Sequence, residues 1–137
     1  MFSEDKITLF NSYVVDRTTK YVKTYLYGVD WQEKQSMNIN QVRGIMTADS
    51  ISIFVNYDVN SNGKKYIAPR AFLQLSDSEK ENYYTFKAND KIVKGIVDFD
   101  INETNTIKQL ETNYDGVVDI KTVISCNMME YFELGCE

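Results

Sequence analysis

The chain has 137 residues, of which 43% are hydrophobic, 26% charged and 13% aromatic, and its net charge is -5. This length predicts a single domain over residues 1–137, and the apolar content is too high for a disordered protein. No apolar run approaches the ~18 residues of a membrane-spanning helix, so no membrane partner is expected. Histidine is absent, which excludes His-based hydrolase triads and mixed Cys/His zinc sites.

The acidic balance argues against sequence-specific binding to duplex nucleic acid. Phosphate contacts need Lys and Arg gathered on one face, whereas the three arginines lie far apart, at Arg17, Arg43 and Arg70. The first six residues, 1–6, lack a basic stretch followed by an apolar one, so no secretory signal is predicted.

The two cysteines, Cys126 and Cys136, have neither the spacing of a redox CxxC motif nor enough thiols for a structural zinc site. A disulfide between them remains an alternative. Reduced thiols are favoured because no export signal is predicted.

Strand signals dominate the first half of the chain. Residues 7–15 and 20–31 are rich in β-branched and aromatic side chains and predict two neighbouring antiparallel strands with a break at residues 16–17. Residues 32–49 are polar and weakly patterned, which predicts a long loop. Residues 51–57 alternate apolar and polar side chains and form the clearest predicted strand, with Ile51, Ile53, Val55 and Tyr57 on one face.

A hairpin is predicted next, because Asn62-Gly63 is a strong turn signal and residues 64–68 supply a return strand. Pro69 suits the first turn of a short helix that runs to Leu75. Between this helix and residue 97, the sequence predicts a capped turn at 76–79, extended chain at 83–86, a turn at 89–90 and a strand at 92–97. A second helix is predicted with Ile107 and Leu110 on one face and a cap at Thr104 or Asn105. The last predicted elements are a strand at 117–124 and a closing strand at 128–133.

About seven short strands with one or two short helices indicate a mainly β (α+β) fold. We expect a small β-barrel or sandwich, with a helix over one end and a long loop near residues 32–49.

Two acidic stretches resemble the opening of an EF-hand calcium loop. In residues 58–63 the pattern Asp-x-Asn-x-Asn-Gly fits, but the twelfth position is Pro69 instead of the bidentate Glu, so a plain turn is favoured. Residues 98–103 lack the glycine at position six and have Gln109 at position twelve. A solvated turn is favoured there too, with a loosely bound cation left open.

No catalytic, cofactor-binding or metal-binding residue is predicted, and an enzyme is the weaker hypothesis. Paired carboxylates, as in glycosidases, are the one remaining acid–base route, and no pair stands out in an apolar setting. Phosphate loops, nucleophile elbows and dinucleotide fingerprints are absent. The aromatic groups Tyr21/Tyr25/Tyr27 and Tyr83-Tyr84-Phe86 leave open a sugar-stacking platform, although core or subunit interface is favoured.

A family resemblance is carried by the order of four segments: Tyr66–Leu73, Tyr84–Gly95, Thr106–Glu111 and Val118–Val123. Residues 50–135 resemble a family of small minor virion proteins, the head–tail joining (neck) proteins of tailed phages and prophages of low-GC Gram-positive bacteria, with a looser fit to the opening strands and Trp31. The family pattern places Trp in the last strand, where this chain has Tyr131-Phe132.

The resemblance implies a stopper-like head–tail joining protein that forms a ring, expected to be a hexamer, around the DNA channel. Its partners would be its own copies, neighbouring portal or connector and tail proteins, and double-stranded DNA that passes without sequence-specific contact. It would be made in the bacterial host cytoplasm and reside in the virion. Residues 32–49 are the candidate segment for reaching a neighbour or narrowing the channel. The alternatives are a tail-completion or other minor capsid protein and, from other classes, a β-sandwich glycan-binding module or a carboxylate glycosidase.

Overall fold

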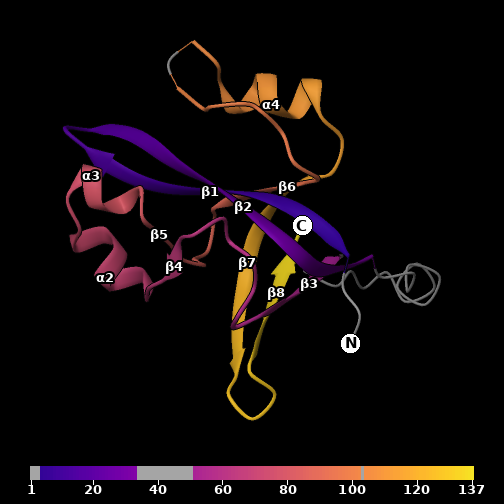
Figure 1. The fold of residues 1–137 in the computed structure, drawn as a ribbon. Helices are drawn as coiled ribbons and strands as arrows, with labels where there is room; N and C mark the ends of the chain where they lie inside the picture. Colours follow the sequence, from indigo (N-terminus) through magenta and orange to yellow (C-terminus); the bar gives the residue numbers. More distant parts are fainter. Residues whose placement is uncertain (1–3, 34–50, 103) are drawn as a thin grey trace, which may run out of the picture.

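The computed structural model describes residues 4–33, 51–102 and 104–137. Six strands form a closed barrel in the order β1-β2-β3-β8-β7-β6, with every neighbouring pair antiparallel (Figure 1). The predicted mainly β fold is confirmed, and it is a barrel rather than a sandwich. The barrel strands are β1 (Asp5–Val15), β2 (Thr18–Glu33), β3 (Ile51–Asn56), β6 (Lys91–Lys94), β7 (Val117–Cys126) and β8 (Tyr131–Cys136).

The other elements of the described residues are short and lie outside the barrel. They are the two-stranded sheet of β4 (Lys65–Tyr66) and β5 (Tyr83–Tyr84), and the helices α2 (Pro69–Gln74), α3 (Asp77–Lys80) and α4 (Ile107–Asn113). Pro69 occupies the first turn of α2, and Ser76 caps α3 in a capping box with Glu79, both as predicted.

The β1–β2 hairpin turns at Asp16 and Arg17, both with positive φ, as the break in the strand pattern predicted. Such a turn matches the natural twist of the two strands. β2 continues past Gly28 to Glu33, so Gln32 and Glu33 belong to a strand and not to the predicted loop. The rest of the 32–49 segment lies outside the described residues.

Two apolar clusters cover both faces of the barrel wall. The larger fills the interior and ends in aromatic packing among Tyr84, Phe86 and Phe132. The smaller lies on the outer face, where Leu110 of α4 packs with Phe10 and buried neighbours. Side chains alternate between the two faces of a strand, so β1 supplies apolar residues to both clusters.

The predicted hairpin between residues 51–57 and 64–68 is wrong. β4 is two residues long and pairs in parallel with β5. The physical reason is that both edges of β3 are already occupied, by β2 on one side and β8 on the other. The turn itself is present, with Asn62 and Gly63 at positive φ.

Two predicted boundaries also shift. The last strand is Tyr131–Cys136 instead of 128–133, because burial of Phe132, Leu134 and Cys136 inside the barrel sets its register. Helix α4 is capped by Thr106, not by Thr104 or Asn105. Its hydroxyl accepts from the Gln109 N–H, while the Gln109 side chain accepts from the Thr106 N–H.

Candidate functional site

The β7–β8 hairpin extends beyond the barrel wall (Figure 1). β7 pairs with β6 only through Val117–Asp119, whereas its pairing with β8 continues to Cys126 opposite Tyr131. We call residues 121–130 the arm; all of them are exposed except Cys126, which is half-buried.

The arm carries a set of exposed apolar side chains. Met128 and Met129, in the turn, are 95% and 67% exposed; Val123 and Ile124 of β7 are also exposed, on opposite faces of the strand. Single exposed apolar residues are ordinary, whereas two adjacent methionines this exposed point to an interaction site. Methionine is flexible and polarisable, so it adapts to partner surfaces of irregular shape.

Hydrogen bonds near its turn tie the arm to Tyr57, the residue that follows β3. The Tyr57 hydroxyl donates to Asn127 Oδ1 at 2.7 Å and lies 2.5 Å from Ser125 Oγ. The Tyr57 ring packs on Phe132 with centroids 4.9 Å apart. The direction of the arm is therefore fixed by contacts to the barrel and not by the hairpin alone.

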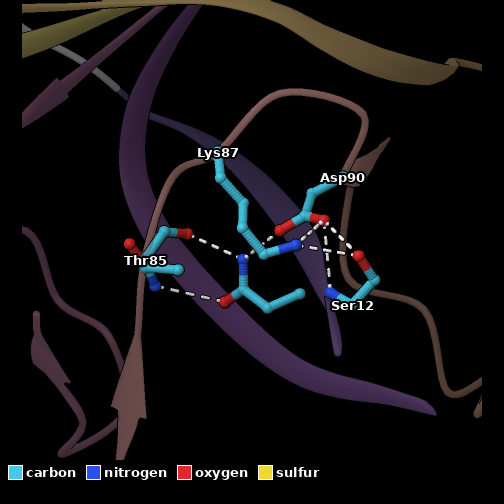
Figure 2. A network of polar contacts seen from close by, with 5 residues as sticks. Ser12, Thr85, Lys87 and Asp90 are labelled. Carbon is cyan, nitrogen blue, oxygen red and sulfur yellow. Dashed lines mark hydrogen bonds and ion pairs between the residues drawn. The ribbon is translucent and has the colours of Figure 1, made fainter. Parts of the chain in front are cut away.

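A buried polar network ties the chain before β6 to β1 (Figure 2). The Asp90 carboxylate is fully buried and accepts from Asn11 Nδ2 at 2.8 Å, Ser12 Oγ at 2.7 Å and Lys87 Nζ at 2.6 Å. Asn11 also donates to the Thr85 carbonyl at 2.7 Å and accepts from the Thr85 N–H at 3.2 Å. Charge-assisted bonds of this kind compensate the cost of burying the carboxylate.

The network suits a structural role better than a nucleophilic one. The Lys87 ammonium donates to both Ser12 Oγ, at 2.8 Å, and Asp90, so it is not placed as a base for the serine. The Ser12 hydroxyl in turn donates to the carboxylate. Sequence reasoning missed this network because its members look like ordinary strand and turn residues; the Asn89-Asp90 turn signal was the only cue.

The two EF-hand-like stretches lie in different surroundings. In residues 58–63 the Asn60 side chain accepts from the Asn62 N–H at 3.1 Å, while the Asn60 backbone pairs with Tyr27. In the second stretch, Asp98 and Asp100 both face Lys23 Nζ, at 3.7 Å and 3.0 Å. Within the described part of the chain, no cluster of three or more acidic or cysteine side chains is arranged to hold a metal.

The aromatic runs do not form one platform. Tyr84 and Phe86 belong to the interior core, and burial raises the pKa of Tyr84 to about 12. Tyr21 packs against the cluster under α4, and the Tyr25 hydroxyl donates to the Val97 carbonyl at 2.9 Å. Tyr84 and Phe86 therefore fit the favoured core interpretation, and Tyr21 is partly buried against the second cluster.

The two cysteines lie at opposite ends of the hairpin. Cys126 ends β7 and pairs with Tyr131, whereas Cys136 ends β8 and lies opposite Ile120. They are not joined by a disulfide, in agreement with the preference for reduced thiols.

A comparison with protein families shows which family the chain belongs to. A family model described as "Family of unknown function (DUF6751)" matches residues 2–137. The chain belongs to this family. No curated protein and no solved structure matches the DUF6751 chain. Among its described residues, no helix is long and apolar enough to cross a membrane.

Proposed function

We propose that the chain is a non-enzymatic structural protein of a tailed-phage or prophage-derived particle. It acts at the head–tail interface as a stopper-like joining protein, and its copies form a ring, expected to be a hexamer, around the DNA channel. The observation that carries this proposal is the arm, a projecting hairpin with exposed Met128 and Met129. Together with the resemblance of residues 50–135 to neck proteins, it supports a role in assembly.

The barrel supplies the stiffness that such a role needs. Barrel closure leaves few strand edges for uncontrolled pairing, so contacts between copies are confined to chosen projections. The buried Asp90 network and the two apolar clusters hold the segments around the barrel in place. A projection mounted on a rigid support costs little conformational entropy when it docks.

The net charge of -5 supports passage of DNA rather than binding. A channel lined by acidic side chains repels phosphates over a distance of about 10 Å at 0.1 M salt. Duplex DNA would then slide through the ring without sequence-specific contact.

A tail-completion or other minor capsid protein is the nearest alternative, and it shares the assembly role. A glycan-binding module is favoured by one observation, a hollow of about 410 Å³ lined by Tyr57, Tyr66, Ser125 and Phe132. Aromatic rings can stack on sugars, so titration calorimetry against a panel of oligosaccharides tests this alternative. Saturable heat of binding with one class of oligosaccharide would favour the glycan-binding module over the neck role.

The decisive genetic experiment is an in-frame deletion in the phage or prophage that encodes the chain. We expect DNA-filled heads and separate tails by electron microscopy, and restoration of tailed particles by the wild-type gene in trans. The arm variant (Met128→Asp with Met129→Asp) should fold but not restore them. Ile96→Asp is the matched control, since Ile96 is 40% exposed outside the arm, and it should restore them. Infectious tailed particles from the deletion would refute the proposal.

A further inference from the structure

A second exposed apolar region lies at the distal end of the β1–β2 hairpin. It is a groove of about 580 Å³ between Ser12–Val15 of β1 on one side and the α2–α3 region, including Leu73, Leu75 and Lys80, on the other. Val14 and Leu73 are 68% and 51% exposed.

The β1 wall of the groove has no strand beside it. β1 pairs with β6 only through Ile7–Phe10, and beyond Phe10 it pairs with β2 alone among the described strands. The Ser12 N–H already donates to Asp90 Oδ1 at 3.2 Å, so an incoming segment meets the β1 edge beyond Ser12 on one side and helices on the other. Peptides that add to a sheet edge commonly bind in such settings.

One lysine of the lining, Lys80, gives the groove a preference for an acidic occupant; its Nζ lies over the Tyr13 ring, 4.7 Å from the centroid. The other lysine of the lining, Lys87, is already paired with Asp90 at 2.6 Å. The acidic residue of the lining, Asp77, has Lys20 Nζ at 4.0 Å. Lys80 is buried and donates to the Leu75 carbonyl, so its position is fixed before any partner arrives.

We propose that the groove receives the arm of a second copy of the chain. The arm offers Met128 and Met129 to the apolar lining, and Glu130 at the end of its turn to Lys80. This contact rests on the proposed function, because it describes how copies of the chain join in the proposed ring.

The location of the two surfaces makes this contact head-to-tail. The β7–β8 hairpin that forms the arm and the segments that line the groove, the end of the β1–β2 hairpin and α2–α3, extend from different sides of the barrel (Figure 1). Each copy then gives its arm to one neighbour and receives the arm of another. Such heterologous contacts generate closed rings when the rotation between copies closes.

Complementation between two variants tests the contact. The arm variant keeps an intact groove, and a groove variant (Val14→Asp with Leu73→Asp) keeps an intact arm. Sedimentation velocity at millimolar concentration should show oligomers for the wild type and for Ile96→Asp, and monomers for each of the two variants alone. Their equimolar mixture should form a heterodimer and nothing larger, because only one intact arm–groove pair remains. Circular dichroism checks that every variant is folded.

Three outcomes would overturn the contact: a monomeric wild type, a groove variant that assembles like the wild type, or a mixture that stays monomeric. A charge reversal adds an independent measurement. Glu130→Lys should weaken assembly, whereas the matched reversal Glu111→Lys on exposed α4 should leave it unchanged. Equal assembly of Glu130→Lys and Glu111→Lys would contradict the charge part of the contact.

The same data separate this contact from the neck role. If the mixture forms the heterodimer but the chain is absent from purified particles, the contact stands and the neck role fails. If the chain is in the neck but the groove variant still assembles there, the contact alone fails.

Discussion

The side chains of Asn11 and Asp90 are hydrogen bonded at 2.8 Å, both fully buried, although 79 positions separate them in the chain. Asn11 lies where β1 leaves β6, and Asp90 precedes β6. The bond therefore fixes the junction from which the β1–β2 hairpin projects. The neighbouring residue, Ser12, begins one side of the groove.

Removal of the buried carboxylate should be costly. In Asp90→Ala, the Lys87 ammonium, the Asn11 amide and the Ser12 hydroxyl lose a common acceptor. We expect the free energy of unfolding to fall by about 3–5 kcal/mol, the usual cost of breaking a buried pair. Urea denaturation followed by circular dichroism measures it. The control is Lys20→Met, which breaks the exposed pair with Asp77 and should cost no more than about 1 kcal/mol. Similar losses for the two variants would contradict the role assigned to Asp90.

The burial of Tyr84 predicts an alkaline loss of stability. Its pKa is about 12 in the folded chain against 10.0 for an exposed tyrosine, because desolvation disfavours the phenolate. The unfolded chain therefore loses this proton first, and stability present below pH 10 decreases as the pH rises to 12. Two pKa units correspond to about 2–3 kcal/mol at most.

Urea denaturation at pH values below and above this window, compared between the wild type and Tyr84→Phe, measures that loss. The loss should be smaller in Tyr84→Phe. It should persist in Tyr83→Phe, which retains Tyr84. If Tyr84→Phe loses as much stability between these pH values as the wild type does, the alkaline loss is not due to Tyr84.

The position of the turn end of the arm should depend on the Tyr57 hydroxyl. Tyr57→Phe removes the contacts to Ser125 and Asn127 but keeps the ring that packs on Phe132. We expect a small change in global stability, about 0.5–1.5 kcal/mol, with faster amide hydrogen exchange confined to the arm. Hydrogen-exchange mass spectrometry resolves the two effects. Tyr114→Phe, in the cluster under α4, should leave exchange in the arm unchanged. Unchanged amide hydrogen exchange in Tyr57→Phe would show that the hairpin alone fixes the direction of the arm.

Local signals explain which parts of the fold were predictable. The turn at Asp16 and Arg17, Pro69 at the start of α2 and the Ser76–Glu79 box act over a few residues, so the sequence displays them directly. Barrel closure is different, because one of the two partners of β3 is β8, which lies far along the chain. The turn at Asn62-Gly63 therefore suggested a local hairpin that the occupied edges of β3 exclude.

The solvent exposure of individual side chains accounts for the remaining differences between the predicted and the observed structure. Met128 and Met129 are apolar, which predicts a place in the closing strand, yet they lie in the turn of the arm. Asn11 and Asp90 are polar, and the sequence predicts a strand and a turn for them but no buried contact, yet both are fully buried. Apolar character does not reveal which side chains a closed fold leaves outside, and polar character does not reveal which ones it pairs inside.

Electron cryo-microscopy of particles from the phage or prophage that encodes the chain tests the central claim most directly. We expect density for the six-stranded barrel repeated as a ring between head and tail, with the DNA channel through its centre. A complete neck built without this chain would contradict the account.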